Sequence, residues 1–115
     1  MIRLKRAYEP ATKADGRRVL VERLWPRGVP KARLRLDEWA KDVAPSPALR
    51  QWFGHDPAKW KQFEQRYWKE LQQRKEAVAL LRQKAKTNTV TLIYAAKDER
   101  HNGALVLKEF IEHRN

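Results

Sequence analysis

The sequence predicts a single α/β domain over residues 1–115, built on a small, mainly parallel β-sheet that is flanked by helices. Its length suits one hydrophobic core. Residues 90–96 are apolar almost throughout and β-branched at their start, as a central strand covered on both faces is. Helical patterns stand directly before and after this stretch, and that alternation is typical of parallel sheets with right-handed crossovers.

Two strands are expected near the amino terminus. Residues 2–6 alternate apolar and basic side chains, which is the pattern of a half-exposed strand. Residues 7–18 contain the turn pair Asp15-Gly16 and show no apolar periodicity, so they are interpreted as a loop. A second strand is expected over residues 19–24, because two prolines and a glycine within the next six residues prevent a longer ladder.

The middle of the chain has helical patterns. Residues 31–43 predict a short helix followed by an extended piece around residues 37–41. Two later helix starts pair a capping side chain with a proline: Ser46-Pro47 and Asp56-Pro57. The first of these helices should end at Phe53, with Gly54 in the left-handed conformation.

The second start opens a long amphipathic pattern. Its apolar residues fall at steps of 3, 4, 4, 7 and 3 along the chain: Trp60, Phe63, Tyr67, Leu71, Val78 and Leu81. A break is expected near Gln73, because one helix of about 30 residues would be long for so small a domain. A last helix is capped within residues 98–102, and its apolar residues share one face: Ala104, Leu107, Phe110 and Ile111.

Positive charge is concentrated in the first third of the chain. The formal net charge is +12. Residues 1–35 hold 11 Lys and Arg against 3 Asp and Glu, a balance of +8, and residues 36–115 hold 15 against 11, a balance of +4. This excess favours anionic partners, from small phosphates to nucleic acid. The alternative is a solvated surface that keeps the protein soluble.

The composition excludes several kinds of site. The chain has no cysteine, which excludes disulfides, thiolate metal sites and cysteine nucleophiles. Its three histidines are not at metal-ligand spacing and no glycine-rich phosphate loop is present, so neither a metal nor a cofactor is predicted. There is no apolar run that could span a membrane and no signal-peptide pattern, so we expect a cytoplasmic protein. The oligomeric state is left open.

Two polar loops follow predicted strands, at residues 23–28 and 97–102. Ligands of parallel α/β folds bind in the crevice at the carboxyl ends of the strands, where such loops lie. In the first loop, Arg23 and Arg27 offer guanidinium groups that can bind a phosphate or carboxylate with two hydrogen bonds each. The alternative is that Arg23 pairs with a buried carboxylate while Arg27 is solvated.

In the second loop, His101 and Asn102 stand where the last strand passes into its helix. The exposed N–H groups of a first helical turn bind anions, and an imidazole beside them can donate or accept a proton. The alternative is an asparagine cap with a histidine that only packs. Asp98, at the start of this turn, is a further candidate ligand-binding residue.

Two more candidates lie between the predicted helices. His55, at a helix-to-helix corner, is the second candidate acid–base group, and the neighbouring Asp56 is interpreted as a cap. Lys41 can turn its ammonium group into the same crevice, although a solvated lysine fits the sequence equally well.

Three ordered motifs resemble the signature of the YeaO-like family, a domain of unknown function numbered 488. They are VLVERLWPRG at residues 19–28, WFGHDP at residues 52–57, and YAAKD at residues 94–98 leading into His101-Asn102. The resemblance runs from Ile2 to about Phe110. It implies an α/β fold with polar residues gathered at one end of the sheet, and no particular activity, because the family is uncharacterised.

The chain departs from longer relatives at one turn. Those relatives have a Cys-His-Arg sequence where this chain has Arg100-His101-Asn102, so sulfur chemistry cannot be carried over from them. Pro30 also replaces the serine that the resemblance leads us to expect.

The leading hypothesis is a site for a small anionic, phosphate-bearing molecule at the carboxyl end of the sheet. The sequence assigns its lining to Arg23, Arg27, His101 and Asn102, and then to Lys41, His55 and Asp98. If the site is catalytic, His101 or His55 would act as acid or base, with arginine stabilising negative charge. The rival hypothesis is an accessory protein that binds nucleic acid weakly and non-specifically through the basic residues 1–35.

Overall fold

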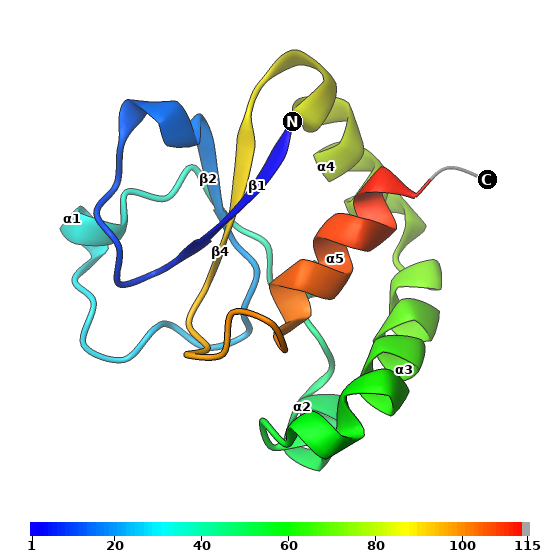
Figure 1. The fold of residues 1–115 in the computed structure, drawn as a ribbon. Helices are drawn as coiled ribbons and strands as arrows, with labels where there is room; N and C mark the ends of the chain where they lie inside the picture. The colour runs from blue at the N-terminus through cyan, green and yellow to red at the C-terminus, as the bar shows by residue number, and fades with distance from the viewer. Residues whose placement is uncertain (114–115) are drawn as a thin grey trace.

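Four short strands form one parallel sheet in the computed structural model, which describes residues 1–113 (Figure 1). In sheet order they are β1 (Ile2–Arg6), β4 (Val90–Tyr94), β2 (Arg17–Leu20) and β3 (Glu38–Trp39). Leu92 on the central strand β4 lies opposite Leu4 on β1 and Val19 on β2. Every pairing is parallel, so the predicted α/β fold is confirmed and all four strands end at one edge of the sheet.

Helices lie on both sides of this sheet. They are α1 (Lys31–Leu34), α2 (Pro47–Phe53), α3 (Trp60–Gln72), α4 (Lys75–Thr87) and α5 (Gly103–Glu112). Three short 3-10 turns are η1 (Lys13–Asp15), η2 (Lys41–Val43) and η3 (Pro57–Lys59). Figure 1 shows α3, α4 and α5 together on one side of the sheet and α1 on the other. None of the helices in the described part of the chain has the length and apolar character needed to cross a bilayer.

The central strand β4 is buried on both faces. Leu92 faces the larger core, which packs against α3, α4 and α5, whereas Ile93 faces a smaller core that contains Leu34 of α1. This alternation is the two-residue period of a strand. The buried Thr91 is satisfied because its hydroxyl donates to the backbone carbonyl of Asp15 at 2.6 Å. The apolar run in the sequence therefore marks the centre of the sheet.

The helix ends follow the capping signals in the sequence. Ser46 accepts a backbone N–H in the first turn of α2, and Gly54 ends that helix with a φ of 52°. The break expected near Gln73 is confirmed, because it falls between α3 and α4. Asn102 caps α5 by accepting the N–H of Leu105 at 2.9 Å. Local signals thus place the loops that lead into and out of the carboxyl edge of the sheet.

The predicted second strand began too late. It was expected from Val19, but β2 begins at Arg17. Arg18 lies inside the strand with its side chain buried, and its guanidinium pairs with Asp15 at 2.6 Å. A buried arginine gives no apolar signal, so sequence periodicity could not detect this part of the strand.

The same strand also ends earlier than predicted, at Leu20 and not at Leu24. Two residues further on, the side-chain carboxylate of Glu22 accepts a hydrogen bond from the backbone N–H of Ala95 at 3.0 Å. This contact replaces the ladder between β2 and β4. It also leaves a carboxylate at the carboxyl edge of the sheet.

Candidate functional site

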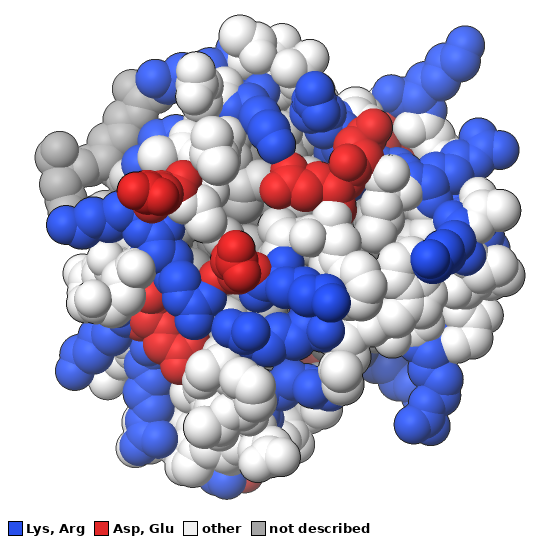
Figure 2. Space-filling model, turned by 180° about the vertical axis from the view of Figure 1, so that it is seen from behind, with Lys and Arg blue, Asp and Glu red and all other residues white. Residues whose placement is uncertain are grey.

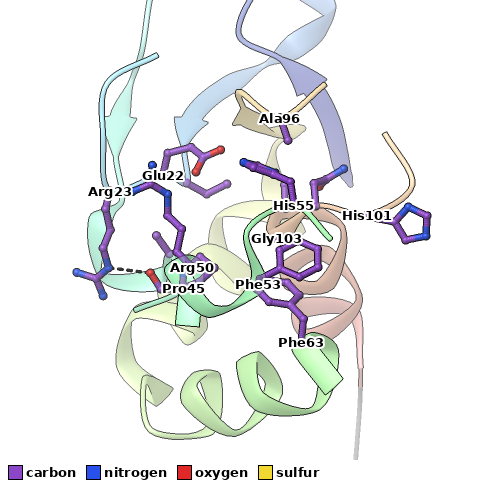
Figure 3. A pocket seen from close by; sticks show the side chains of 14 residues that line it. Glu22, Arg23, Pro45, Arg50, Phe53, His55, Phe63, Ala96, His101 and Gly103 are labelled. Carbon is purple, nitrogen blue, oxygen red and sulfur yellow. Dashed lines mark hydrogen bonds between the residues drawn. The ribbon is translucent and has the colours of Figure 1, made fainter. Parts of the chain in front are cut away.

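A cavity lies at the carboxyl ends of β2 and β4, between α2 and the start of α5 (Figure 3). Its volume is about 50 Å³. A single water needs about 10–15 Å³ of such space, so the cavity accommodates a group of a few heavy atoms. Its polar and charged lining residues are Glu22, Arg23, Arg50, His55, His101 and Asn102. We refer to this space as the inner cavity.

A second and wider space adjoins it, which we call the outer hollow. Its volume is about 290 Å³, and it shares Glu22, Arg50 and His55 with the inner cavity. Trp25 and Arg27 line the outer hollow but not the inner cavity. These three polar residues, together with Ala96, line both spaces and therefore stand at the border between a narrow inner space and a wider outer one.

Glu22, Arg50 and His55 gather at this border. Figure 3 shows the three side chains on the same side of the inner cavity. Burial raises the pKa of Glu22, and the hydrogen bond from Ala95 together with the charges of Arg50 and His55 opposes that rise. The site thus combines one half-buried carboxylate with a guanidinium group and an imidazole that line the same space.

His55 is held at the border by an uncommon backbone conformation. Its φ is 58°, in the left-handed region, and it directly follows Gly54 at 52°. A residue with a side chain loses about 1–2 kcal/mol in this region. Asp56 then caps η3 by accepting the N–H of Ala58 at 3.0 Å, as the sequence predicts. Strained residues are concentrated at functional sites, so this conformation supports a role for His55.

The two arginines of the first loop line different spaces. Arg23 is half-buried, and its Nε donates to the carbonyl of Pro45 at 2.9 Å (Figure 3). Arg27 is exposed and lines only the outer hollow. The structure therefore does not bring Arg23 and Arg27 to one point, where the sequence placed them together.

His101 lines the inner cavity at its far side. Its Nδ1 lies 2.8 Å from Oδ2 of Asp98, and its ring stands edge-on to Trp60 with 5.2 Å between ring centroids. In Figure 3 the imidazole points away from Glu22 and Arg50. The hydrogen bond with His101 is the main cause that lowers the pKa of Asp98. Asp98 itself does not line either space. Its carboxylate accepts the backbone N–H groups of Arg100 and His101 and so orders the turn before α5.

The amino terminus of α5 forms one wall of the inner cavity. Asn102 is buried, its Oδ1 caps the helix, and its Nδ2 donates to the carbonyl of Asp98 at 3.0 Å. Gly103 and Ala104, the first two residues of the helix, line the cavity beside it. The N–H groups of a first helical turn, with the positive end of the helix dipole, attract anions.

Lys41 lies outside this site. Its Nζ stands 4.0 Å from the centroid of the Trp39 ring, and it lines another hollow, formed by β3, η2 and α4. The cation–π contact orients the ammonium group away from the crevice that the sequence assigned to it. Within residues 1–113, no three His, Asp or Glu side chains are grouped as ligands for a metal ion.

Comparison with known proteins identifies the family. A family model described as the inactive DUF488-N3 subclade matches residues 1–115. The chain belongs to this DUF488 subclade. It is 43% identical over 110 residues to the uncharacterized protein YeaO of Escherichia coli, with 96% of each chain covered. It is also 39% identical over 113 residues to the uncharacterized proteins Rv3073c of Mycobacterium tuberculosis and Mb3100c of Mycobacterium bovis, covering 98% of this chain and 95% of theirs. No solved structure matches the chain significantly.

The three motifs that carry the DUF488 resemblance meet at the inner cavity. The first motif contributes Glu22 and Arg23, the second contributes His55, and the third leads into His101 and Asn102. These segments are far apart in the sequence, and the parallel sheet brings them to one edge. The cavity is therefore built from the most recognisable parts of this DUF488 chain.

Two residues of the site were not among the sequence candidates. Glu22 lies inside the first DUF488 motif, directly before Arg23. A carboxylate within this motif could have been identified from the sequence as a candidate site residue. Arg50 lies in the last turn of α2, five residues before His55, and nothing in the helical pattern distinguishes it from other exposed basic residues. Its contribution depends on tertiary packing, in which α2 lies against α3.

Proposed function

We propose that this DUF488 protein binds a small anionic, phosphate-bearing molecule at the carboxyl edge of its sheet. The observation that carries the proposal is the convergence of cationic groups from separate segments on one cavity. Arg50 and His55 stand at its border, Arg23 lines its edge, and the start of α5 forms a wall. Guanidinium groups and helix amino termini are the usual ligands of phosphate in proteins.

The size of the two spaces supports this class of ligand. The inner cavity, at about 50 Å³, fits the few heavy atoms of a tetrahedral oxyanion and excludes a whole nucleotide. The outer hollow, at about 290 Å³, has room for the remainder of a small phosphate ester. Arg27 would then contact that remainder.

The charge of the whole molecule supports the same proposal. The net charge of +12 attracts anions over a long range. Figure 2 shows one face of the molecule, on which lysine and arginine side chains are spread widely and acidic side chains lie between them. A general basic surface of this kind concentrates anions near the protein, and the inner cavity supplies a localised site for one of them.

Acid–base catalysis is a second candidate, favoured by the contact between Asp98 and His101. A carboxylate at Nδ1 fixes the imidazole tautomer and leaves Nε2 to take a proton. The ring nevertheless points away from Glu22 and Arg50, whereas His55 stands with them at the border (Figure 3). The description of the matching DUF488 subclade as inactive supports binding over catalysis.

Thermal unfolding with inorganic phosphate and small phosphate esters tests the proposed site. A ligand at one hundred times its dissociation constant stabilises the folded state by about 2.7 kcal/mol, which a melting curve resolves easily. Arg50→Ala is expected to abolish the shift, because it removes the guanidinium at the border. Arg27→Ala should retain the shift with inorganic phosphate and reduce it for larger esters, because Arg27 lines only the outer hollow.

The matched control is Arg17→Ala. Arg17 is exposed at the opposite edge of the sheet, at the start of β2, so its loss lowers the net charge equally without touching the cavity. It should leave the phosphate shift unchanged. A panel of phosphates with no effect on the melting temperature, or an equal shift in wild type and Arg50→Ala, would leave only a solvated basic surface.

A further inference from the structure

Glu22 is an unexpected group in a site for anions. It is half-buried, lines both the inner cavity and the outer hollow, and binds the N–H of Ala95 through Oε1. Within residues 1–113, no group donates a hydrogen bond to its Oε2. That oxygen is also accessible to solvent. Among the described residues, the one side-chain nitrogen or oxygen that is buried without a hydrogen-bond partner belongs to Arg18. Glu22 therefore has one acceptor oxygen free for a ligand.

A free carboxylate oxygen has a definite consequence for the ligand. Arg50 and His55 attract a phosphate to the border, but the carboxylate of Glu22 stands beside them and repels it. The repulsion becomes an attraction when the ligand places a hydrogen-bond donor between its phosphate and Glu22. A hydrogen bond that involves a charged group is also among the stronger ones in proteins.

The geometry points to a specific class of ligand. Resting on the proposed function, we propose that the molecule carries an amine or hydroxyl group close to its phosphate, and that Glu22 accepts a hydrogen bond from that group. The phosphate lies with Arg50 and His55, and the donor faces Oε2. Glu22 then disfavours simple alkyl phosphates, which leave the carboxylate unpaired beside a second negative charge.

Three ligands of nearly equal size test this selectivity. They are propyl phosphate, 2-hydroxyethyl phosphate and phosphoethanolamine, which end in a methyl, a hydroxyl and an ammonium group. Titration of the wild-type protein, followed by calorimetry or by NMR shifts of the cavity residues, should give affinities that rise in that order. We expect at least a tenfold difference between the first and the last.

The variant Glu22→Gln should have opposite effects on the ligands that carry a donor and on the ligand that does not. Glutamine keeps an oxygen for the N–H of Ala95, but it removes the negative charge at the second position. Phosphoethanolamine should bind about tenfold more weakly to the variant, whereas propyl phosphate should bind equally or more tightly. Retained binding of propyl phosphate also shows that the variant is folded.

The matched control is Glu109→Gln. Glu109 is exposed on α5 outside both spaces, so its substitution changes the net charge by the same amount without touching the ligand. It should leave the wild-type order intact.

The outcomes separate this inference from the function on which it rests. If none of these ligands and no inorganic phosphate binds the wild type, the anion site itself is absent and the inference falls with it. If the three ligands bind equally, or if Glu22→Gln weakens all of them alike, the anion site stands and the role of Glu22 is refuted.

Discussion

His55 has the most unusual backbone conformation among the residues of the candidate site. Its left-handed conformation, at a φ of 58°, follows the left-handed Gly54 that ends α2. Glycine adopts this region without steric cost, whereas a residue with a Cβ does not. The histidine at this position places an imidazole near Glu22 at the expense of local strain.

The first prediction follows from that strain. His55→Gly removes the imidazole and relieves about 1 kcal/mol of backbone strain. Glycine also makes the unfolded chain more flexible, which costs about 0.5–1 kcal/mol of folding free energy, so the two effects nearly cancel. Stability in urea should therefore be nearly unchanged, while the phosphate-induced shift in melting temperature becomes smaller. His55→Val should lose stability, since a β-branched side chain is poorly suited to this region. An unaltered phosphate shift in His55→Gly would remove His55 from the site.

For individual residues, the sequence indicated which side chains are candidates for the site better than it indicated which groups they contact. His55 and Arg23 were identified from their loops, and both line the inner cavity. The sequence left Lys41 open between the crevice and solvent, and its contact with the Trp39 ring depends on tertiary packing that no local pattern encodes. Arg50 escaped attention for the complementary reason. It is an exposed helical arginine like several others, and only the packing of α2 against α3 brings it to the candidate site.

At the scale of elements, β1, η1 and β2 are joined by a buried ionic cluster. Asp15 of η1 is fully buried and pairs with Lys5 of β1 at 3.0 Å and with Arg18 of β2 at 2.6 Å. Burial alone would raise the pKa of Asp15, but hydrogen bonds from Thr12, Lys5 and Arg18 lower it well below its usual range. The cluster ties η1 to the neighbouring strands β1 and β2.

This cluster predicts how stability depends on pH. A carboxyl group whose pKa is lowered by folding stabilises the folded state at pH values above its pKa in the unfolded chain, about 3.9. This stabilisation disappears as the pH falls through the pKa of the group in the folded protein. Urea unfolding of the wild type should show stability decreasing below about pH 4. Asp15→Asn should lose about 3 kcal/mol at pH 6, because the buried Arg18 and the half-buried Lys5 lose their counter-charge, and its stability should fall less on acidification.

The exposed Asp42 supplies the control for that measurement. Its carboxylate makes no hydrogen bond or ion pair within residues 1–113, so Asp42→Asn should follow the wild-type pH profile. A profile for Asp15→Asn that parallels the wild type would contradict the role assigned to the cluster.

The elements themselves were largely accessible from sequence. Capping residues and apolar spacing marked α2, α3, α4 and α5, and the continuous apolar run marked β4. The exception was β2, whose first half contains the buried Arg18. Polar residues that are buried in ion pairs look like loop residues in a sequence. Strand boundaries are therefore predicted wrongly where charged residues are buried in the core.

At the scale of the whole molecule, the basic amino-terminal third does not consist only of free charge. Five of its arginines donate to backbone carbonyls: Arg3 to Ala14, Arg6 to Ala96, Arg18 to Leu34, Arg23 to Pro45 and Arg33 to Tyr8. Lys5 and Arg18 are occupied by Asp15. Part of the +8 balance of residues 1–35 therefore holds loops to the sheet. This internal use reduces the charge that can be presented to a long polyanion.

The last prediction concerns nucleic acid. Attraction to DNA through unspecific phosphate contacts gives dissociation constants of about 10⁻⁴–10⁻⁶ M at physiological salt and weakens steeply as salt rises, because bound counterions are released. We expect this protein to lie in that range, with equal affinity for duplexes of different sequence, measured by fluorescence anisotropy between low and high salt. Arg50→Ala should lower this affinity no more than Arg17→Ala does, since each removes one positive charge, whereas only Arg50→Ala abolishes binding of small phosphates. A clear sequence preference at physiological salt, or a selective loss of DNA binding in Arg50→Ala, would instead make nucleic acid the ligand of the cavity.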